Sequence, residues 1–221
     1  MIINTAKKYS PKLLNEFIYP NNEVRDLVTA YASGDIERPL ILYGSSGSGK
    51  SLLQRLVPQA IQSKETQVNK VICSDLKLPR DIHELYGRNK QFNNVFTVND
   101  QRYNYFIIEE FYMKSIRLND ALKIELDASL GTDLTIFSTN RFELIDSGIL
   151  SRSEVLEVQP CTPSIFFPHA KKIMQAEEID ISDYDLLVNL NAIYVAYKDN
   201  RKYYSMMDAL IRRERTQCLT T

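Results

Sequence analysis

The segment at residues 44–51 has the residue types and spacing of a loop that binds phosphate. It follows the pattern G-x-x-x-x-G-K-[ST] and consists of Gly44, Ser45, Ser46, Gly47, Ser48, Gly49, Lys50 and Ser51. Its glycines let the backbone curl until successive N–H groups point at a β-phosphate, and a following helix adds its positive N-terminal end. We expect Lys50 to bridge the β- and γ-phosphates, Ser51 to hold Mg²⁺, and Leu52 to complete the contacts. The expected ligand is a magnesium-complexed nucleoside triphosphate.

Two adjacent glutamates, Glu109 and Glu110, follow the apolar run at residues 105–108. A nucleotide loop of this kind needs an acidic strand end across the sheet, which holds the magnesium and polarises the attacking water. We expect Glu109 on the metal side, and Glu110 as a general base that acts through one water. The alternative is that both glutamates only mark a solvated strand end.

A parallel sheet would bring these groups together, and the chain alternates short apolar runs with longer amphipathic stretches, as that fold requires. The predicted fold class is therefore α/β, with a five-stranded parallel sheet of the P-loop type flanked by helices. The near-continuous apolar character of the strands predicts that they are buried on both faces. The predicted strands cover residues 40–43, 68–73, 105–108, 134–138 and 155–158.

Two helical stripes are expected between these strands. The first begins after Gly49, and Pro58 should kink this helix or end its regular part. The second covers residues 118–126 and should end near Gly131.

From Gln159 onward the strand signal disappears. Thr162 is expected to cap a helix over residues 163–176, and two further helices should start near 182–183 and 199–200. We therefore predict a nucleotide-binding α/β domain over residues 1–158 and a small helical lid domain over residues 159–221.

The composition is that of an ordinary globular protein, because 44% of the 221 residues are hydrophobic and 25% are charged. The net charge of −1 gives no global basic field, so any contact with nucleic acid or an anionic membrane must be local. The few metal-binding and redox residues are far apart and predict neither a disulfide framework nor a zinc site; they are Cys73, Cys161, Cys218, His83 and His169.

The N-terminus has no apolar run before its charges, and no stretch approaches the roughly 20 apolar residues of a membrane helix. We expect no membrane partner and a reducing cytoplasm, either bacterial or that of a virus-infected host cell, with the nucleus as an alternative.

Four further segments carry a resemblance to a known family. They are Lys8-Tyr9-Ser10-Pro11-Lys12, Thr139-Asn140, Ser151-Arg152-Ser153 and Asp199-Asn200-Arg201-Lys202. In this order they resemble the AAA+ ATPases, and among these the clamp-loader subunits such as replication factor C and its phage counterparts. The resemblance spans nearly the whole chain, although Ser10 stands where the family's N-terminal signature has arginine.

The resemblance implies a role for each segment. Tyr9 and Pro11 would wrap the base of ATP, and Asn140 would be the sensor 1 residue that orients the attacking water. Arg152 would reach into the nucleotide site of a neighbouring subunit, and Arg201 would be the sensor 2 residue of the lid. Taken singly, an asparagine after a strand is usually a turn former, and an isolated arginine is usually a solvated surface charge.

The same resemblance implies an ATPase that assembles as a homo- or hetero-oligomeric ring or spiral around DNA and is slow as a monomer. Its partner would be a sliding clamp or a replicative helicase. The collar domain of clamp loaders is not found after the lid segment, so a helicase loader or an initiator-related regulator is an alternative.

Two other classes of function stay open. A non-hydrolysing ATP-binding adaptor would use the same loop, and a small-molecule kinase would have no use for Asn140 and Arg152. DNA contact is expected through one of two sets of basic residues. The alternative, that these residues are ordinary solvated surface charges, explains both sets equally well. The first set is Arg80, Arg88, Asn89 and Lys90, and the second is Arg212, Arg213 and Arg215.

Overall fold

The structure is a computed structural model that describes residues 4–62, 66–95 and 102–217, with the side chains of residues 88–95 and 217 left out of the description. Contacts divide the chain into two compact units. The α/β unit comprises Glu23–Gly44 and Lys50–Val158. The helical unit comprises the described residues of Met1–Asn22, Ser45–Gly49 and Gln159–Thr221, so the N-terminal segment and the middle of the loop group with the C-terminal helices.

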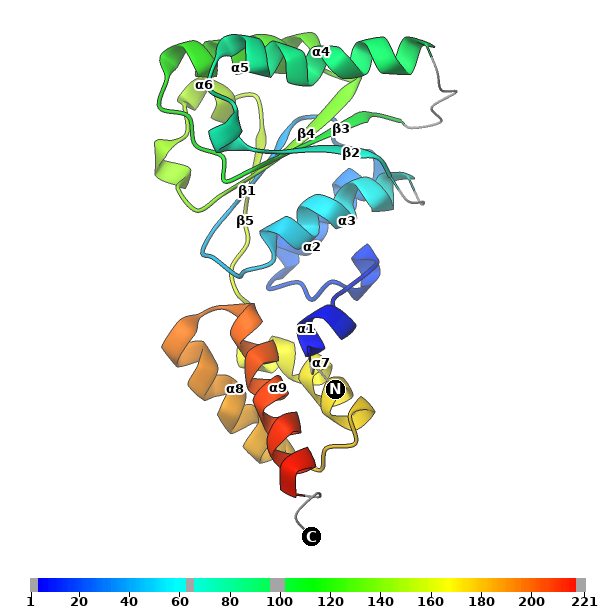
Figure 1. The fold of residues 1–221 in the computed structure, drawn as a ribbon, viewed down its shortest axis with the longest axis vertical. Coiled ribbons are helices and arrows are strands. Elements are labelled where there is room, and N and C mark those ends of the chain that lie inside the picture. Colours follow the sequence, from blue (N-terminus) through cyan, green and yellow to red (C-terminus); the bar gives the residue numbers. More distant parts are fainter. Residues whose placement is uncertain (1–3, 63–65, 96–101, 218–221) are drawn as a thin grey trace. The chain divides into compact units, whose positions relative to one another are not determined.

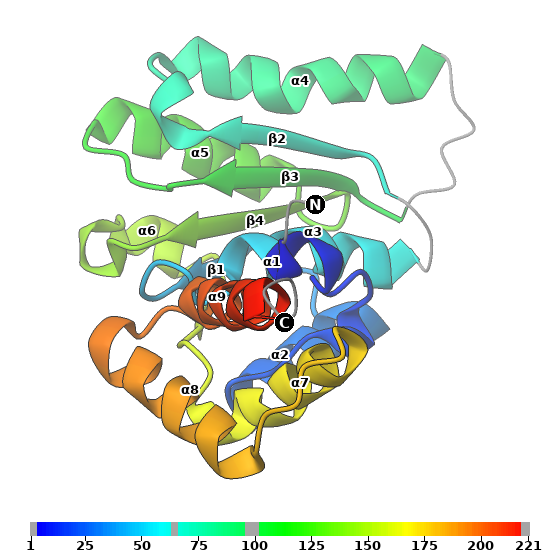
Figure 2. The same cartoon turned by 60° about the horizontal axis from the view of Figure 1, so that its bottom comes forward.

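The α/β unit contains a five-stranded sheet in the order β2-β3-β4-β1-β5, and all four neighbouring pairs are parallel. The strands are β1 (Leu40–Tyr43), β2 (Val68–Ile72), β3 (Asn104–Glu109), β4 (Asp133–Thr139) and β5 (Glu154–Glu157). In Figure 2 the arrows of β2, β3 and β4 lie side by side and point the same way. The predicted fold class is confirmed, and the strand ends differ from the predicted ones by one residue at most.

The prediction that all strands are buried on both faces is wrong for the two edge strands. Side chains of β2 alternate between exposed and half-buried, and Ile72 is 42% exposed. All seven residues of β4 are buried, because β4 has a neighbouring strand on each side and helices over both faces.

Helices cover both faces of the sheet (Figure 1). One face carries α4 (Pro79–Val95) and α5 (Ile116–Ala128), and the other carries α2 (Asn22–Ser33) and α3 (Lys50–Gln62). The short helix α6 (Ser147–Leu150) follows β4. Helix α3 continues through the buried Pro58, so the expected end of its regular part at this residue is wrong.

A large core cluster lies beneath α4 and α5, where apolar side chains of these helices pack on the central strands. From the strands it includes Ile41, Phe106, Ile108 and Phe137, and from the helices Ile82, Tyr86, Leu118 and Leu122. Each fully buried side chain of this size contributes about 1.5–3 kcal/mol. This packing holds the strands in place and thereby positions the polar residues at their carboxyl ends.

The helical unit contains α1 (Thr5–Lys8), α7 (Pro163–Ala176), α8 (Asp183–Tyr197) and α9 (Asn200–Gln217). Its core is separate from that of the sheet and includes Phe166, Ile173, Leu190, Tyr203 and Met207. The N-terminal helix α1 joins this unit through the Thr5 N–H, which donates to Asp208 Oδ1 at 2.9 Å.

The helix starts follow their capping residues only in part. Ser182 caps α8, because its Oγ accepts a hydrogen bond from the Asp185 N–H at 3.0 Å. Helix α7 begins at Pro163 as predicted, but the Thr162 side chain does not cap it and contacts the Ser164 hydroxyl instead. Among the described residues, no helix is both long and apolar enough to cross a bilayer.

Candidate nucleotide site

The loop between β1 and α3 has a backbone that requires glycine. Gly44, Gly47 and Gly49 have φ values of 135°, 75° and 110°, a region that residues with a side chain rarely adopt. A Cβ atom at Gly44 would also lie 2.4 Å from the Val158 carbonyl oxygen. Lys50 is buried, and its Nζ donates to the Gly44 carbonyl oxygen at 2.9 Å. The loop therefore has the glycine-dependent curl that the phosphate-binding pattern predicts.

Ser51 and Leu52 follow in the first turn of α3, where Ser51 is exposed and Leu52 is half-buried. One turn later, the buried Gln54 donates from Nε2 to the Ile136 carbonyl oxygen at 2.9 Å. Its Oε1 atom is buried and has no hydrogen-bond partner within the described part of the chain. Sequence reasoning missed Gln54, which ties the helix after the loop to strand β4.

The acidic strand end lies on the same edge of the sheet. Glu109 is the last residue of β3. Its Oε2 forms an ion pair with Nζ of Lys70, a residue of β2, at 2.9 Å. This pair could not be predicted from the sequence, because it depends on β2 lying beside β3.

Glu110 is exposed and has a φ of 52°. Such a left-handed conformation is uncommon for a residue with a side chain, and residues with strained backbones of this kind are often found at functional sites. The next residue, Phe111, donates its N–H to the Ser138 carbonyl oxygen of β4 at 2.7 Å, which holds the chain in this turn.

Asn140 follows the last residue of β4 and is exposed. Thr139 pairs in register with Tyr43, the last residue of β1. Asn140 and the loop therefore start from neighbouring strands at the same edge, and Glu109 ends the strand on the other side of β4. This edge lies where parallel sheets change strand order, which is where they commonly bind ligands.

Magnesium prefers oxygen ligands, and Ser51 and Glu109 offer a hydroxyl and a carboxylate. Both residues belong to the α/β unit. The donor chemistry fits the metal, and the ion pair with Lys70 is made to only one of the two carboxylate oxygens of Glu109.

In the helical unit, the start of α9 is hydrogen-bonded to the middle of the loop. The Asn200 N–H donates to the Gly47 carbonyl oxygen at 3.2 Å, and its Nδ2 donates to the Ser48 carbonyl oxygen at 3.2 Å. Its Oδ1 accepts from the Cys161 N–H at 2.9 Å. Asn200 was not among the predicted site residues, and its place next to Arg201 in the resembling segment was the only available signal.

Arg201 contacts both the loop and the residue before Asn200. Its Nη2 donates to Ser46 Oγ at 2.8 Å. The same guanidinium is bound by Asp199, from Nε to Oδ1 at 3.2 Å and from Nη2 to Oδ2 at 2.9 Å. Arg201 therefore lies at the loop, as a sensor of bound phosphate would.

Tyr9 lies at the end of α1, with its ring against the helical core. Its hydroxyl donates to Glu177 Oε1 at 2.8 Å, and Lys8 and Arg215 bind the same carboxylate, each at 2.7 Å. Hydrogen bonds from Lys8 and Tyr9 lower the pKa of Glu177. Pro11 is buried. A contact of Tyr9 and Pro11 with a base stays a prediction.

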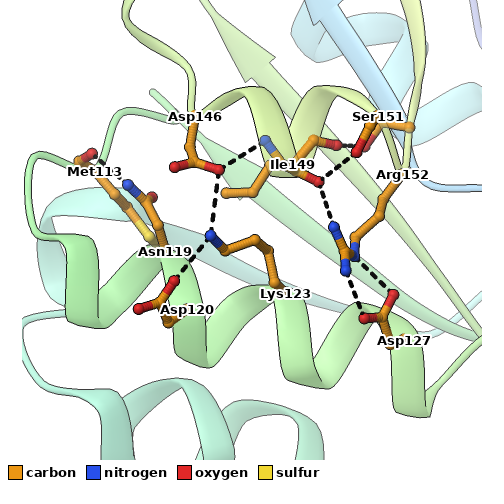
Figure 3. Close-up of polar contacts among 11 residues, drawn as sticks. Met113, Asn119, Asp120, Lys123, Asp127, Asp146, Ile149, Ser151 and Arg152 are labelled. Atoms are coloured by element: carbon orange, nitrogen blue, oxygen red, sulfur yellow. Dashed lines mark hydrogen bonds and ion pairs between the residues drawn. The ribbon is translucent and has the colours of Figure 1, made fainter.

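Arg152 follows α6 and is held by its own chain (Figure 3). Its Nε and Nη2 donate to the two carboxylate oxygens of Asp127, at 2.7 and 2.8 Å. Its Nη1 donates to the Gly148 carbonyl oxygen at 2.8 Å. The side chain is 34% exposed, so it is accessible from outside the chain. The hydrogen bonds from Arg152 lower the pKa of Asp127.

The two basic sets have different surroundings. Arg80 pairs weakly with Asp81 at 3.8 Å, and the side chains of Arg88, Asn89 and Lys90 lie outside the described residues. In the second set Arg212 and Arg213 are exposed, whereas Arg215 pairs with Glu177.

Comparison with known proteins finds relatives over most of the chain. Subunit 5 of mouse replication factor C is 24% identical over 181 residues, which is 80% of this chain and 52% of that protein. DNA polymerase III subunit gamma of Buchnera aphidicola is 22% identical over 197 residues, which is 82% of this chain and 55% of that protein. This chain therefore spans about half the length of these two relatives.

A solved structure of Thermotoga maritima RuvB, a single-residue variant, has the same fold with a TM-score of 0.58 and 16% identity. The match covers 91% of this chain and 72% of the RuvB chain. No family model matches the sequence.

Proposed function

We propose that this chain, which is similar to clamp-loader subunits over most of its length, is an AAA+ ATPase of the clamp-loader clade that binds and hydrolyses MgATP between subunits and thereby loads or remodels a protein assembly on DNA. The relatives are a replication factor C subunit and a DNA polymerase III subunit, which favours DNA replication as the setting. A sliding clamp is the first candidate for the loaded protein, and a replicative helicase is the second.

One observation carries this proposal: the groups needed for hydrolysis start from one edge of one sheet. Lys50 follows the loop after β1. Glu109 ends β3 and Glu110 comes directly after it, while Asn140 follows β4, the strand between β3 and β1. Charged and polar groups fixed in this way stabilise developing charge without having to reorganise during the reaction.

Each of these residues has a task that its position supports. Lys50 would exchange the Gly44 carbonyl oxygen for phosphate oxygens, and Ser51 and Glu109 would hold Mg²⁺, which supplies charge neutralisation. Glu110 would accept the proton of the attacking water, and Asn140 would orient that water. Arg201 would lie against the phosphates from the Ser46 side of the loop, and Arg152 would complete the site of a neighbouring subunit.

The test uses two variants, each of which lacks one half of a composite site. Lys50→Ala removes nucleotide binding but keeps Arg152, and Arg152→Ala does the reverse. We expect little ATP hydrolysis from either chain alone and a clear gain on mixing, measured with primed DNA present. A mixture that hydrolyses no faster than the two chains separately contradicts completion between subunits.

The Lys70–Glu109 ion pair favours a second candidate function. If Lys70 keeps the carboxylate away from the metal, the chain would bind ATP without turnover and act as an adaptor. Lys70→Ala separates the two candidates. In an ATPase the unmodified chain already releases phosphate, and the substitution should leave the rate unchanged or raise it. In an adaptor of this kind the unmodified chain should bind ATP tightly without phosphate release, and release should begin only in Lys70→Ala, where Glu109 has lost its ion-pair partner.

A further inference from the structure

The guanidinium of Arg152 keeps part of its donor capacity while bound to its own chain. A guanidinium has five N–H groups, one on Nε and two on each terminal nitrogen. Asp127 takes the N–H of Nε and one of Nη2, and the Gly148 carbonyl takes one of Nη1. Nη1 and Nη2 therefore each have a second N–H that these three hydrogen bonds do not use. These two N–H groups lie away from the edge of the guanidinium that Asp127 binds.

The residues that hold Arg152 are themselves fixed between α5 and α6 (Figure 3). Lys123 Nζ lies 3.5 Å from Asp146 Oδ1, and that oxygen accepts the Gly148 N–H at 2.8 Å. Lys123 and Asp127 are four residues apart on α5 and therefore share one face of the helix. Two ion pairs thus join α5 to the α6 segment, one helical turn apart.

The contribution of the Arg152–Asp127 ion pair to folding stability is too small to explain its role. Asp127 is 57% exposed, and even though its bidentate geometry makes this one of the stronger kinds of exposed ion pair, such pairs contribute only modestly to the free energy of folding. The pair also restricts the rotamers of Arg152. A long charged side chain normally loses this conformational entropy when it is ordered at an interface. In this chain that entropy is already lost before a neighbour binds.

We propose that Asp127 is a positioning residue for Arg152. It fixes the guanidinium by its Nε and Nη2 edge, so that the remaining terminal N–H groups face the phosphates of the nucleotide on the neighbouring subunit. Asp127 does not touch the nucleotide and acts only through Arg152. This inference rests on the proposed function, in which Arg152 completes the neighbour's site.

The test places the change in the chain that supplies the arginine. The donor chain carries Lys50→Ala, and the acceptor chain carries Arg152→Ala, so hydrolysis by the mixture depends on arginine supplied by the donor. Adding Asp127→Asn to the donor leaves the hydrolysing pocket unaltered. We expect kcat of the mixture to fall about two- to tenfold, the equivalent of ordering one long side chain, with KM for ATP unchanged.

Asp120→Asn in the donor is the matched control. Asp120 lies on the same helix with the same 57% side-chain exposure, but it binds Lys123 and not Arg152. This control should hydrolyse ATP at the rate of the unmodified donor. If Asp127→Asn behaves like the control or gives a faster rate, the inference is wrong while the proposed function stands. If the unmodified donor restores no hydrolysis, the proposed function fails first.

A spectroscopic measurement tests the holding of Arg152 independently of turnover. In ¹⁵N-labelled chain, the Nε–H signal that Arg152→Lys removes should exchange slowly with solvent, because it donates to Asp127. Asp127→Asn should speed this exchange, and Asp120→Asn should not. Fast exchange of that signal in the unmodified chain, or no change in Asp127→Asn, contradicts the positioning role.

Discussion

Two arginines of this chain are each bound by an aspartate, but their surroundings differ. Arg201 is bound by Asp199, two residues earlier in the chain, and it also donates to Ser46 in the loop of its own chain. Arg152 is bound by Asp127, 25 residues earlier, and its other contact is the Gly148 carbonyl. Arg201 is therefore directed to the phosphate loop by local structure, whereas Arg152 is held by the packing of α6 on α5.

The difference suggests two separate tasks for the same chemical group. An arginine against the loop of its own chain should affect how tightly nucleotide binds. An arginine held at an exposed position away from the loop should affect the rate of a reaction in another subunit. Each of the following substitutions would strengthen or contradict this division.

The largest effect is expected for Arg152→Ala. An arginine supplied to a phosphoryl-transfer site changes the rate by on the order of 10³ to 10⁵, so kcat of the assembled protein should fall by that order. The affinity of the same chain for ATP should not change, because its own loop is intact. Steady-state hydrolysis and nucleotide titration measure the two effects, and Arg117→Ala on the exposed face of α5 is the control. A loss of affinity with little loss of kcat would reverse the assignments.

The next effect is expected for Gly47→Ala, which alters the place where the Arg201 segment meets the loop. A Cβ at this residue would lie 1.8 Å from Asp199 Oδ1, and the φ of 75° disfavours alanine. We expect a loss of about 2 kcal/mol in the free energy of unfolding, measured by denaturant titration. Gly87→Ala is the control, because this helical glycine has open space around its Cβ position and alanine should be neutral or stabilising there.

Arg201→Ala should weaken ATP binding by about tenfold, the equivalent of one charge-assisted hydrogen bond at an exposed site. The measurement is a titration with fluorescent nucleotide. Lys202→Ala is the matched control, since Lys202 is the adjacent exposed cation and lies over the Tyr197 ring. Equal effects of the two substitutions would mean that only general positive charge matters at the start of α9.

The smallest effect is expected for Lys198→Gly, immediately before Asp199. Lys198 ends α8 in the left-handed conformation, with φ 47° and ψ 48°. Glycine adopts this conformation without a steric penalty, so thermal unfolding should show stabilisation by about 0.5–1 kcal/mol. Lys198→Ala keeps the penalty and should show no gain. A gain in both variants would point to the lost charge instead of the backbone.

Structural elements could be predicted from the sequence where a short run of neighbouring residues determines them. Five apolar runs predicted five strands to within one residue, because burial in a sheet demands such runs. The glycines at 44, 47 and 49 predicted a curled loop, because few other residues adopt its backbone. Helices α2 and α4 were not predicted, although α2 carries a local signal, a stripe of buried apolar residues at Val24, Val28 and Tyr31. The pattern in α4 is weaker, because polar residues predominate over its length.

Contacts between distant segments could not be predicted from one sequence. Glu109 was assigned to a metal, but its partner Lys70 becomes visible only when the strand order is known. Asp127 is 25 residues before Arg152 and has no local pattern that marks it. Asn200 binds the loop through hydrogen bonds over more than 150 positions. In each case the missing information is which surfaces pack together.

The hydrogen bond from Lys50 to the Gly44 carbonyl has a consequence for the stability of the loop itself. A buried ammonium left without an acceptor is costly. Here the loop supplies that acceptor from its own first residue. The Gly44 carbonyl therefore stabilises the buried ammonium from within the loop, and any ligand of this loop would have to compete with that carbonyl for Lys50.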